Sequence, residues 1–298
     1  MHDLLQEMGK EIVRQESPKE AGKRSRLWFY EDVRHVLEEN TGTNTIEAIL
    51  LDFPKDDDDM QIRLHSEAFM NMKNLRLLFI NWNIVQFSGG PPNYLPNKIR
   101  VPDWPEYPWS ILPSNFHGNK LVEFQMPFSL IKELGVLKSK NLTVMNLSEC
   151  QFLTKIYDLS SCRNLENLDL GDCENLVEVH DSVGFLDTLS SFLVSGCCKL
   201  RILLKRFKLR SLCFFNLYDC SSLKDFPKIE CEMEFLHVLD FGGTSIRELP
   251  SSIENLTQLQ ELYAIDCKNL RHLPSSIFQL QSLRIVKVKD GIQCTRVE

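Results

Sequence analysis

The sequence predicts an α/β fold, a solenoid in which short parallel strands stack into one curved sheet on the inner face. Leucines recur at steps of 23 or 24 residues, an apolar residue stands three places after each, and a small residue, mostly cysteine, stands eight places after it. The seven leucines are Leu142, Leu165, Leu189, Leu212, Leu236, Leu259 and Leu283. A repeat of this length and consensus is the leucine-rich repeat.

Each repeat is expected to supply one short strand. In the repeat that opens at Leu165, Leu168 and Leu170 alternate with Asp169, as a strand with one buried side requires. One repeat cannot bury its leucines alone, so the equivalents of Leu168 should stack into one core. These equivalents are Met145, Phe192, Phe215, Leu239, Leu262 and Val286. Truncating one inward leucine to alanine should cost about 2–5 kcal/mol.

The small residue of each repeat should fit beneath the turn that leaves the strand. It is Cys150, Cys173, Cys197, Cys220, Thr244, Cys267 and Gly291 in successive repeats. Five of the ten cysteines therefore belong to this ladder, where they act as small buried residues. The other five form no C-x-x-C pair, so the sequence does not favour a zinc site.

The first 45 residues do not follow the repeat. Residues 1–17 predict an amphipathic helix that ends at Ser17–Pro18, followed by a basic loop over 19–26. The apolar face of this helix carries Leu4, Leu5, Met8, Ile12 and Val13. A short buried strand is expected over 27–30. A second helix should then turn Val33, Val36 and Leu37 inward and stop at Thr41–Gly42. We interpret residues 1–45 as the end of a different domain.

About ten repeats are predicted over residues 46–298. The first strand is expected over 46–51, and weaker repeats open at Leu75, Ile99 and Leu121. Residues 84–115 are irregular, because Pro102 stands where an inward leucine belongs and proline cannot donate to a strand ladder. The sequence Leu-Pro-Ser-Ser-Ile occurs at 249–253 and 273–277, where serine is expected to cap a short helical turn on the outer side. The pattern is lost over 290–298, so we interpret the solenoid as truncated there.

Composition and motifs narrow the function. The 298 residues carry a net charge of −7, which does not favour nucleic acid, and no apolar run approaches the length of a membrane span. No basic-then-apolar signal peptide opens the chain, so we expect the cytoplasm. The phosphate-binding loop, the serine hydrolase elbow and the H-E-x-x-H zinc motif do not occur. The sequence therefore predicts a protein that is not an enzyme.

A protein-binding face is the function that the pattern favours. Residues between and just after the inward leucines should point to solvent on the inner face. The position before the cysteine ladder is acidic or glycine in each repeat, with aromatic residues nearby, which suits a partner that carries arginine or lysine. The predicted partner-binding residues are Glu149, Asp169, Asp172, Phe214, Asn216, Tyr218, Asp219, Asp240, Tyr263 and Asp266.

A second interpretation of the acidic strip needs no partner. Aspartate and glycine are both favoured at tight turns, so the turn that enters the ladder is sufficient to select them. The six basic residues over 199–210 are interpreted as a solvated loop on the outer or edge side.

The N-terminal segment carries a second set of motifs. They are Met1–His2–Asp3, Arg24–Ser25–Arg26–Leu27–Trp28, Asp32–Val33 and Asn40–Thr41–Gly42–Thr43. With the ladder form seen at Asn146–Cys150 and Asp169–Cys173, they resemble plant intracellular immune receptors, the disease resistance proteins that join a TIR domain, a nucleotide-binding domain and leucine-rich repeats. The resemblance covers essentially the whole chain, which starts at the family's M-H-D motif.

The resemblance implies what the N-terminal segment is. Residues 1–45 would be a partial winged-helix remnant of the nucleotide-binding domain, in which His2 and Asp3 match the motif whose histidine contacts ADP. The rest of the nucleotide cradle is missing, and a phosphate site needs several converging donors. We therefore expect no cofactor in this chain, although the complete family architecture binds ADP or ATP.

The resemblance also implies a role. The repeats would recognise a pathogen effector or a modified host protein on the concave face, and would restrain the nucleotide-binding domain of the same receptor, in defence signalling in the cytoplasm or the nucleus. One alternative is an extracellular leucine-rich-repeat receptor domain, which glycosylation at the sequons of Asn141, Asn146 or Asn255 would support. The other, for the full-length product only, is an ADP/ATP-dependent switch.

Overall fold

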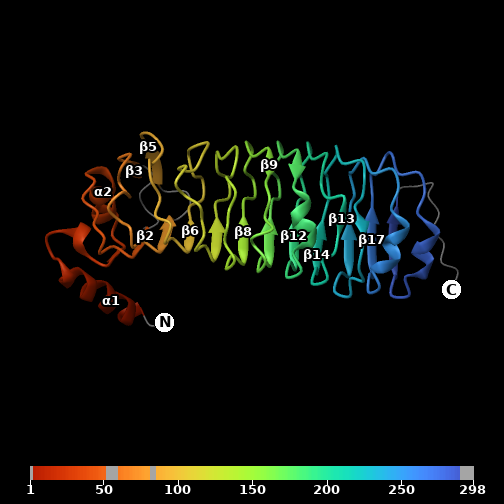
Figure 1. Cartoon of the computed structure of the whole chain (residues 1–298), viewed down its shortest axis with the longest axis horizontal. Coiled ribbons are helices and arrows are strands. Elements are labelled where there is room, and N and C mark those ends of the chain that lie inside the picture. The colour runs from red at the N-terminus through yellow and green to blue at the C-terminus, as the bar shows by residue number, and fades with distance from the viewer. Residues whose placement is uncertain (1–2, 52–59, 81–84, 289–298) are drawn as a thin grey trace.

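The computed structural model is a single elongated solenoid, built from strands that repeat along its long axis (Figure 1). It describes residues 3–51, 60–80 and 85–288. Twelve strands form one parallel sheet along the inner face. In spatial order they are β1 (Arg26–Leu27), β2 (Ala48–Leu51), β4 (Leu77–Ile80), β6 (Val101–Asp103), β7 (Glu123–Gln125), β8 (Val144–Asn146), β10 (Asn167–Asp169), β12 (Ser191–Leu193), β14 (Phe214–Asn216), β16 (Val238–Asp240), β17 (Glu261–Ala264) and β18 (Ile285–Val288).

The return segments on the outer side are less regular. They hold three two-stranded sheets, which pair β3 (Met60–Arg63) with β5 (Val85–Ser88), β9 (Lys155–Ile156) with β11 (Glu178–Val179), and β13 (Arg206–Phe207) with β15 (Lys228–Ile229). Short 3₁₀ helices replace strands at η2 (Asp181–Phe185), η3 (Ser251–Asn255) and η4 (Ser275–Gln279). This architecture confirms the predicted fold class.

The strand register confirms the predicted stack of inward side chains. Leu168 stands opposite Met145 on one side and Phe192 on the other, and the same row continues through Phe215, Leu239, Leu262 and Val286. The rings of Phe192 and Phe215 stack with their centroids 5.6 Å apart. The leucines that open the repeats at 142, 165, 189 and 212 are fully buried. One core therefore runs along the sheet, and each repeat is stabilised by both neighbours.

The ladder cysteines hydrogen-bond the turns as well as fill space. Cys197 Sγ donates to the Leu170 carbonyl at 3.1 Å, and Cys220 Sγ donates to the Val194 carbonyl at 3.0 Å, each one repeat earlier. The Leu170 carbonyl also receives the N–H of Cys173, but at a longer 3.3 Å. The thiol therefore adds a second donor to a carbonyl whose own turn bond is long.

The ladder differs at its threonine. Thr244 Oγ1 donates at 2.8 Å to the carbonyl of Phe241, within its own turn, rather than to the preceding repeat. The predicted ladder position Gly291 lies outside the described residues.

Pro102 explains the weak pairing in the irregular repeat. β6 pairs with β7 through the single residue pair Asp103 and Gln125, whereas most neighbouring strands pair through three or four. A proline has no N–H to donate, so the ladder is interrupted there. Aromatic packing covers this part of the chain instead, as in the edge-to-face contact of Trp104 with Tyr107 at 5.1 Å.

The N-terminal segment packs directly on the first repeat. α2 (Tyr30–Glu38) buries Val33, Val36 and Leu37, as predicted. The strand expected over 27–30 is shorter, because α2 begins at Tyr30, and it joins the main sheet beside β2. The domain boundary at residue 45 stays a prediction.

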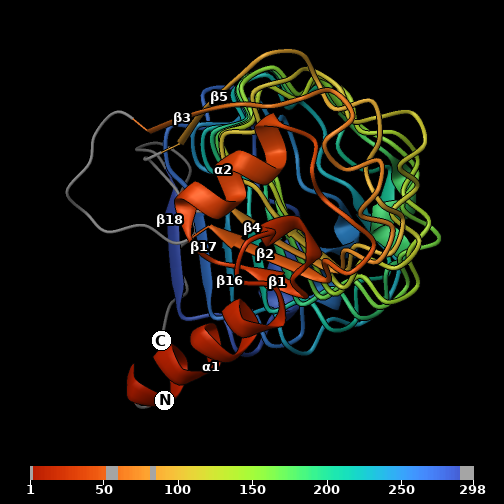
Figure 2. The same cartoon turned by 90° about the vertical axis from the view of Figure 1, so that its left-hand side faces the viewer.

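The first helix is present, but its apolar face is not buried. α1 (Asp3–Glu16) stands away from the solenoid body (Figure 2), and Leu4 and Ile12 are 71% and 66% exposed. Of the predicted apolar face only Val13 is buried. The helix is attached at its C-terminal end, where the Glu16 carboxylate accepts hydrogen bonds from the N–H and the hydroxyl of Ser25.

Not all of the basic loop over 19–26 is solvated. Arg24 is buried, pairs with the Asp32 carboxylate at 2.5 Å, and donates to the carbonyls of Ser17 and Pro18. Two of the N-terminal motifs, which stand eight residues apart, are therefore joined by one ion pair that fixes α2 against the loop.

The expected serine caps are wrong. The residues that cap η3 and η4 are Pro250 and Pro274, and none of the four serines of these motifs caps a helix through its side chain. Ser252 Oγ instead accepts the N–H of Ile229, one repeat earlier, at 3.0 Å. The equivalent Ser276 hydroxyl is buried and has no partner, because the residue one repeat before it lies within η3. These serines join neighbouring repeats where the preceding segment is extended.

Thiol labelling tests the ladder. Burial raises the pKa of Cys150 to about 11 and that of Cys220 to about 12, so little reactive thiolate exists at pH 8. The thiols of Cys198 and Cys213 are only half-buried. Iodoacetamide at pH 8 should alkylate Cys198 and Cys213 roughly tenfold faster than the two ladder cysteines, as followed by peptide mass spectrometry. Equal rates in the folded protein would contradict the ladder, whereas equal rates in denaturant are expected.

Candidate functional site

The predicted partner-binding residues lie along one face of the solenoid. All ten belong to β10, β14, β16 or β17, or to the turn that directly follows β8, β10, β14 or β17. Because the strands are parallel and in register, equivalent residues form rows across neighbouring strands. The structure therefore brings these ten residues together. His2 lies outside the described residues, and only the main chain of Asp3 is described, in α1.

The acidic strip lies in a turn with an unusual main-chain conformation. Its six described residues all have positive φ: 56° at Glu149, 56° at Asp172, 72° at Gly196, 62° at Asp219, 71° at Gly243 and 59° at Asp266. Glycine adopts this left-handed region without strain, and aspartate tolerates it better than most residues. The turn alone thus accounts for the choice between acid and glycine, so the strip does not by itself indicate a ligand.

The aspartates also explain where the glycines fall. A Cβ added to Gly196 would lie 2.0 Å from Oδ1 of Asp172, and one added to Gly243 would lie 2.9 Å from Oδ1 of Asp219. Each carboxylate occupies the space that a Cβ of the next repeat would fill, so a glycine is required at that position.

A second row of predicted residues stabilises the strand ends. Oδ1 of Asp169 accepts the N–H of Gly171 at 2.9 Å, and Oδ1 of Asp240 accepts the N–H of Gly242 at 2.9 Å. Asn216 makes the same bond to the N–H of residue 218 at 2.8 Å. This is the side-chain turn that aspartate and asparagine favour. One oxygen of each side chain is therefore used within the fold.

Burial shifts the titration of this row. Burial raises the pKa of Asp169, the N–H of Gly171 lowers it in part, and the nearby carboxylate of Asp172 raises it further. The net effect is a raised pKa, so the folded chain favours the protonated acid. The negative charge of Asp169 therefore does not stabilise the folded chain.

Exposed apolar side chains distinguish the C-terminal part of the face. Phe214 is 67% exposed and stands directly opposite Val238, which is 43% exposed. Tyr218 and Ile265, in the turns that follow β14 and β17, are 52% and 45% exposed. Gly242 separates these two turns and leaves room for the ring, since a Cβ there would lie 3.3 Å from Cδ2 of Tyr218. We call Phe214, Tyr218, Val238 and Ile265 the aromatic patch.

The strand position of Phe214 varies along the sheet: it is polar in the two preceding strands of the sheet and valine in β8 and β16. The residues equivalent to Phe214 in β10 and β12 are Asn167 and Ser191. The two aromatic rings are therefore a local property of the repeat that opens at Leu212 and not a requirement of the fold.

Tyr263 is less available than the aromatic patch. Its hydroxyl donates to Oε2 of Glu261 at 2.5 Å, which raises the pKa of the phenol, and Nζ of Lys287 stands 5.2 Å from its ring centroid. Its contacts within the face fix it between Glu261 and Lys287.

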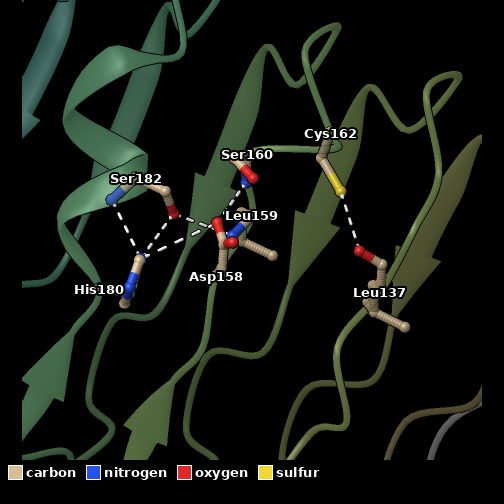
Figure 3. Close-up of polar contacts among 7 residues, drawn as sticks. All are labelled: Leu137, Asp158, Leu159, Ser160, Cys162, His180 and Ser182. Carbon is tan, nitrogen blue, oxygen red and sulfur yellow. Dashed lines mark hydrogen bonds and ion pairs between the residues drawn. The ribbon is translucent and has the colours of Figure 1, made fainter.

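One cluster outside the sheet face has the residue types of a catalytic triad. Asp158, His180 and Ser182 meet on the outer side (Figure 3). Nδ1 of His180 lies 3.0 Å from the serine hydroxyl, 3.9 Å from Asp158, and accepts the Ser182 N–H at 3.2 Å. A triad needs the acid and the serine on opposite ring nitrogens, whereas here both face the same one. The cluster caps η2 and joins two repeats.

Sequence reasoning missed this cluster, although a signal existed. Asp158 and Ser182 are 24 residues apart, which is one repeat, so stacking places them side by side. Among the residues that the structure describes, no group of three histidine, cysteine or acidic side chains could hold a metal ion. Within the same residues, no helix has the length and apolar content needed to cross a bilayer.

The fold and its stacked strands define a leucine-rich-repeat protein, and the sequence comparisons narrow this class. The family described as "Disease resistance protein RPS4B-like, leucine-rich repeats" matches residues 208–297. TMV resistance protein N of Nicotiana glutinosa is 35% identical over 305 residues, which cover 100% of this chain and 25% of that protein. Disease resistance protein RPP2A of Arabidopsis thaliana is 36% identical over 278 residues, or 91% of this chain and 21% of that protein.

The chain is a homologue of these plant disease resistance proteins, which confirms the resemblance found in its motifs. It spans about a quarter of the length of the curated relatives that it matches. Among solved structures, the leucine-rich repeat domain of the type III effector XCV3220 (XopL) has a TM-score of 0.41 and 16% identity, covering 92% of this chain and 80% of that one. The functional domain of InlJ from Listeria monocytogenes has a TM-score of 0.40 and 16% identity, covering 83% and 63%.

Replacing Asp169 by asparagine tests the buried carboxylate. Because its folded pKa is raised, Asp169 contributes stability below its unfolded pKa and loses that contribution as the pH rises through the folded pKa. Asp169→Asn keeps the bond to Gly171, as Asn216 does in its own turn. The variant should therefore be more stable than the wild type at pH 7 but not at pH 4, in urea titrations at both pH values.

The reverse substitution is the matched control. Asn216→Asp should introduce the same loss of stability with rising pH. An Asp169→Asn variant that is less stable at pH 7 would mean that the carboxylate does more in the fold than accept one N–H.

Proposed function

We propose that this chain is the protein-recognition part of a plant disease resistance protein, and that its sheet face binds an effector or a host protein. The single observation that carries the proposal is the aromatic patch, because two rings and two aliphatic side chains are exposed on one face of three neighbouring repeats. Exposed apolar clusters of this kind mark interaction sites more often than aromatic residues scattered singly. The homology to disease resistance proteins supports the biological role.

The surroundings of the aromatic patch suggest the chemistry of the partner. The exposed carboxylates of Asp219 and Asp266 stand beside Tyr218 and Ile265 in the chain. Rings that anchor a contact, flanked by acids at its rim, fit a partner surface that is apolar at its centre and carries arginine or lysine around it. The acids would then set orientation and association rate more than affinity.

Several further parts of the role rest on the family. We expect the repeats to restrain the nucleotide-binding domain of the same receptor, and the chain to act in the cytoplasm, with the nucleus as a second compartment. We also expect it to have no enzymatic activity, since a solenoid of this kind serves as an interaction scaffold.

The structure around two of the glycosylation sequons argues against the alternative of an extracellular receptor domain. Asn255 Nδ2, the atom that would carry a glycan, donates to the Ile229 carbonyl at 3.0 Å and is part-buried. Asn146 is also part-buried, and its Oδ1 accepts bonds from the N–H and the hydroxyl of Ser148. Only Asn141 is exposed. These contacts favour a chain that is not glycosylated at the two positions.

Alanine substitution in the aromatic patch tests the proposal. Phe214→Ala with Tyr218→Ala should reduce capture of a plant protein by the immobilised chain by at least roughly tenfold, since buried anchor rings are worth about 2 kcal/mol or more each. Capture would be quantified by mass spectrometry against the wild-type chain. Asn167→Ala with Ser191→Ala removes side chains from equivalent strand positions outside the patch and should leave capture unchanged.

The acidic strip is tested separately by Asp219→Asn with Asp266→Asn. Asparagine tolerates the positive φ, so the turns stay folded while both charges are lost. Weaker capture would support a role in binding. Unchanged capture would mean that the acidic residues are selected by the turn and not by a partner. Equal capture by all variants would contradict the proposal that the sheet face binds a protein.

The ADP expectation is also testable. α1 stands away from the body, so the described residues provide no second wall for a phosphate site at its N-terminal end. Titration calorimetry with ADP should detect no binding to this chain below millimolar concentration. Micromolar affinity would contradict this expectation and would favour a nucleotide-dependent switch.

A further inference from the structure

We propose a second binding site on the outer side, independent of the sheet face: a notch between residues 110–117 and 132–138 that takes one apolar side chain of an acidic protein segment. The two segments, with Tyr157 of the next repeat, enclose a cavity of about 530 Å³. The sheet-face residues take no part in it.

The notch arises from the shortest repeat. The step from Leu121 to Leu142 is 21 residues, against 23 or 24 in the repeats that follow, so its return segment is short. The segment is tied to its predecessor at both ends, where Lys132 N–H donates to Ser110 at 2.9 Å and Lys138 N–H donates to His117 at 3.3 Å. Both segments are fully described, and no main-chain hydrogen bond joins them in between. The two segments therefore separate between these two hydrogen bonds, and the space between them is the notch.

The notch has an apolar floor and an apolar rim. Leu134, Leu137 and Phe116 form the floor and are at most 8% exposed. Ile111 and Val136 also line the notch and are 58% and 51% exposed, so the rim offers apolar surface to a partner. The floor is also held from the next repeat, since the Leu137 carbonyl receives the thiol of Cys162 at 3.9 Å (Figure 3).

The charges at the rim select the flanking chemistry. His117 and Lys138 line the notch, and neither has a carboxylate within 4.0 Å among the described residues. Glu133 is the one acidic residue of the lining. Lys155 adds positive potential beside Tyr157, at 5.6 Å from its ring, although it also pairs with Glu178. A leucine or similar side chain with carboxylates on either side therefore complements both the floor and the rim.

The shape favours a protein segment over a free small molecule. The volume falls within the usual range of ligand pockets, but such pockets enclose most of their ligand. Here the rim residues are themselves more than half exposed, so a molecule in the notch would keep one side in solvent. An anchor side chain of a partner that covers Ile111 and Val136 completes the burial.

Labelled synthetic peptides test the assignment by fluorescence anisotropy with the full chain. The first peptide carries one leucine with two aspartates on each side, the second has serine for leucine, and the third has lysines for the aspartates. The first should bind at least roughly tenfold more tightly than the other two. Equal binding of all three, no binding of the first, or binding of octanoate without the first peptide would overturn the proposal.

Gly135 permits a variant that fills the notch without disturbing the fold. A Cβ on Gly135 meets nothing within 4 Å, and Gly90, two repeats earlier and outside the notch lining, has equally open surroundings. Gly135→Leu should lower the affinity for the first peptide at least roughly tenfold, whereas the matched control Gly90→Leu should leave that affinity unchanged. Lys138→Glu should shift the preference toward the lysine peptide. Thermal unfolding by circular dichroism verifies each fold, and unaltered peptide affinity in folded Gly135→Leu protein would place the site elsewhere.

Discussion

The register of one strand against the next is the constraint on which the rest of the structure depends. Leu168 stands opposite Met145 and Phe192 because the strands are parallel and the repeats are of nearly equal length. A slip of one residue would turn the whole apolar set toward solvent. The same register places every row of surface residues, so the exposed sheet face and the core that holds the fold come from one geometric rule.

That rule makes surface patterns hard to interpret. Any residue type that suits a turn recurs at every repeat and so forms a row. The acidic strip is such a row, because its positive φ favours aspartate and glycine, and the row of Asp169 and its equivalents completes turns through side-chain hydrogen bonds. Residues that break the repeat carry more information. Phe214 and Tyr218 place aromatic rings where the two neighbouring repeats have serine, valine or glycine, and no turn requires them.

A repeat whose length differs from that of its neighbours is informative in the same way, because it changes the surface locally. The 21-residue repeat at Leu121 keeps its strand and its inward residues but shortens the return segment, so the outer surface opens between 110–117 and 132–138. Pro102 interrupts the ladder without ending the sheet, because the flanking strands still stack on the same core. The solenoid thus tolerates local irregularity on its outer side, where binding surfaces can form at little cost to the core.

By itself the sequence determined the solenoid, the strand stack, the buried ladder cysteines and the homology to disease resistance proteins, because each rests on a period of 23 or 24 residues or on local motifs. Periodicity places equivalent residues side by side, but it does not place residues that differ between repeats. Only the tertiary structure decided that the apolar face of α1 stays exposed, that Arg24 reaches Asp32, and that Ser252 bonds the previous repeat instead of capping its own helix. These outcomes depend on which segment packs against which, and a one-dimensional pattern does not contain that information.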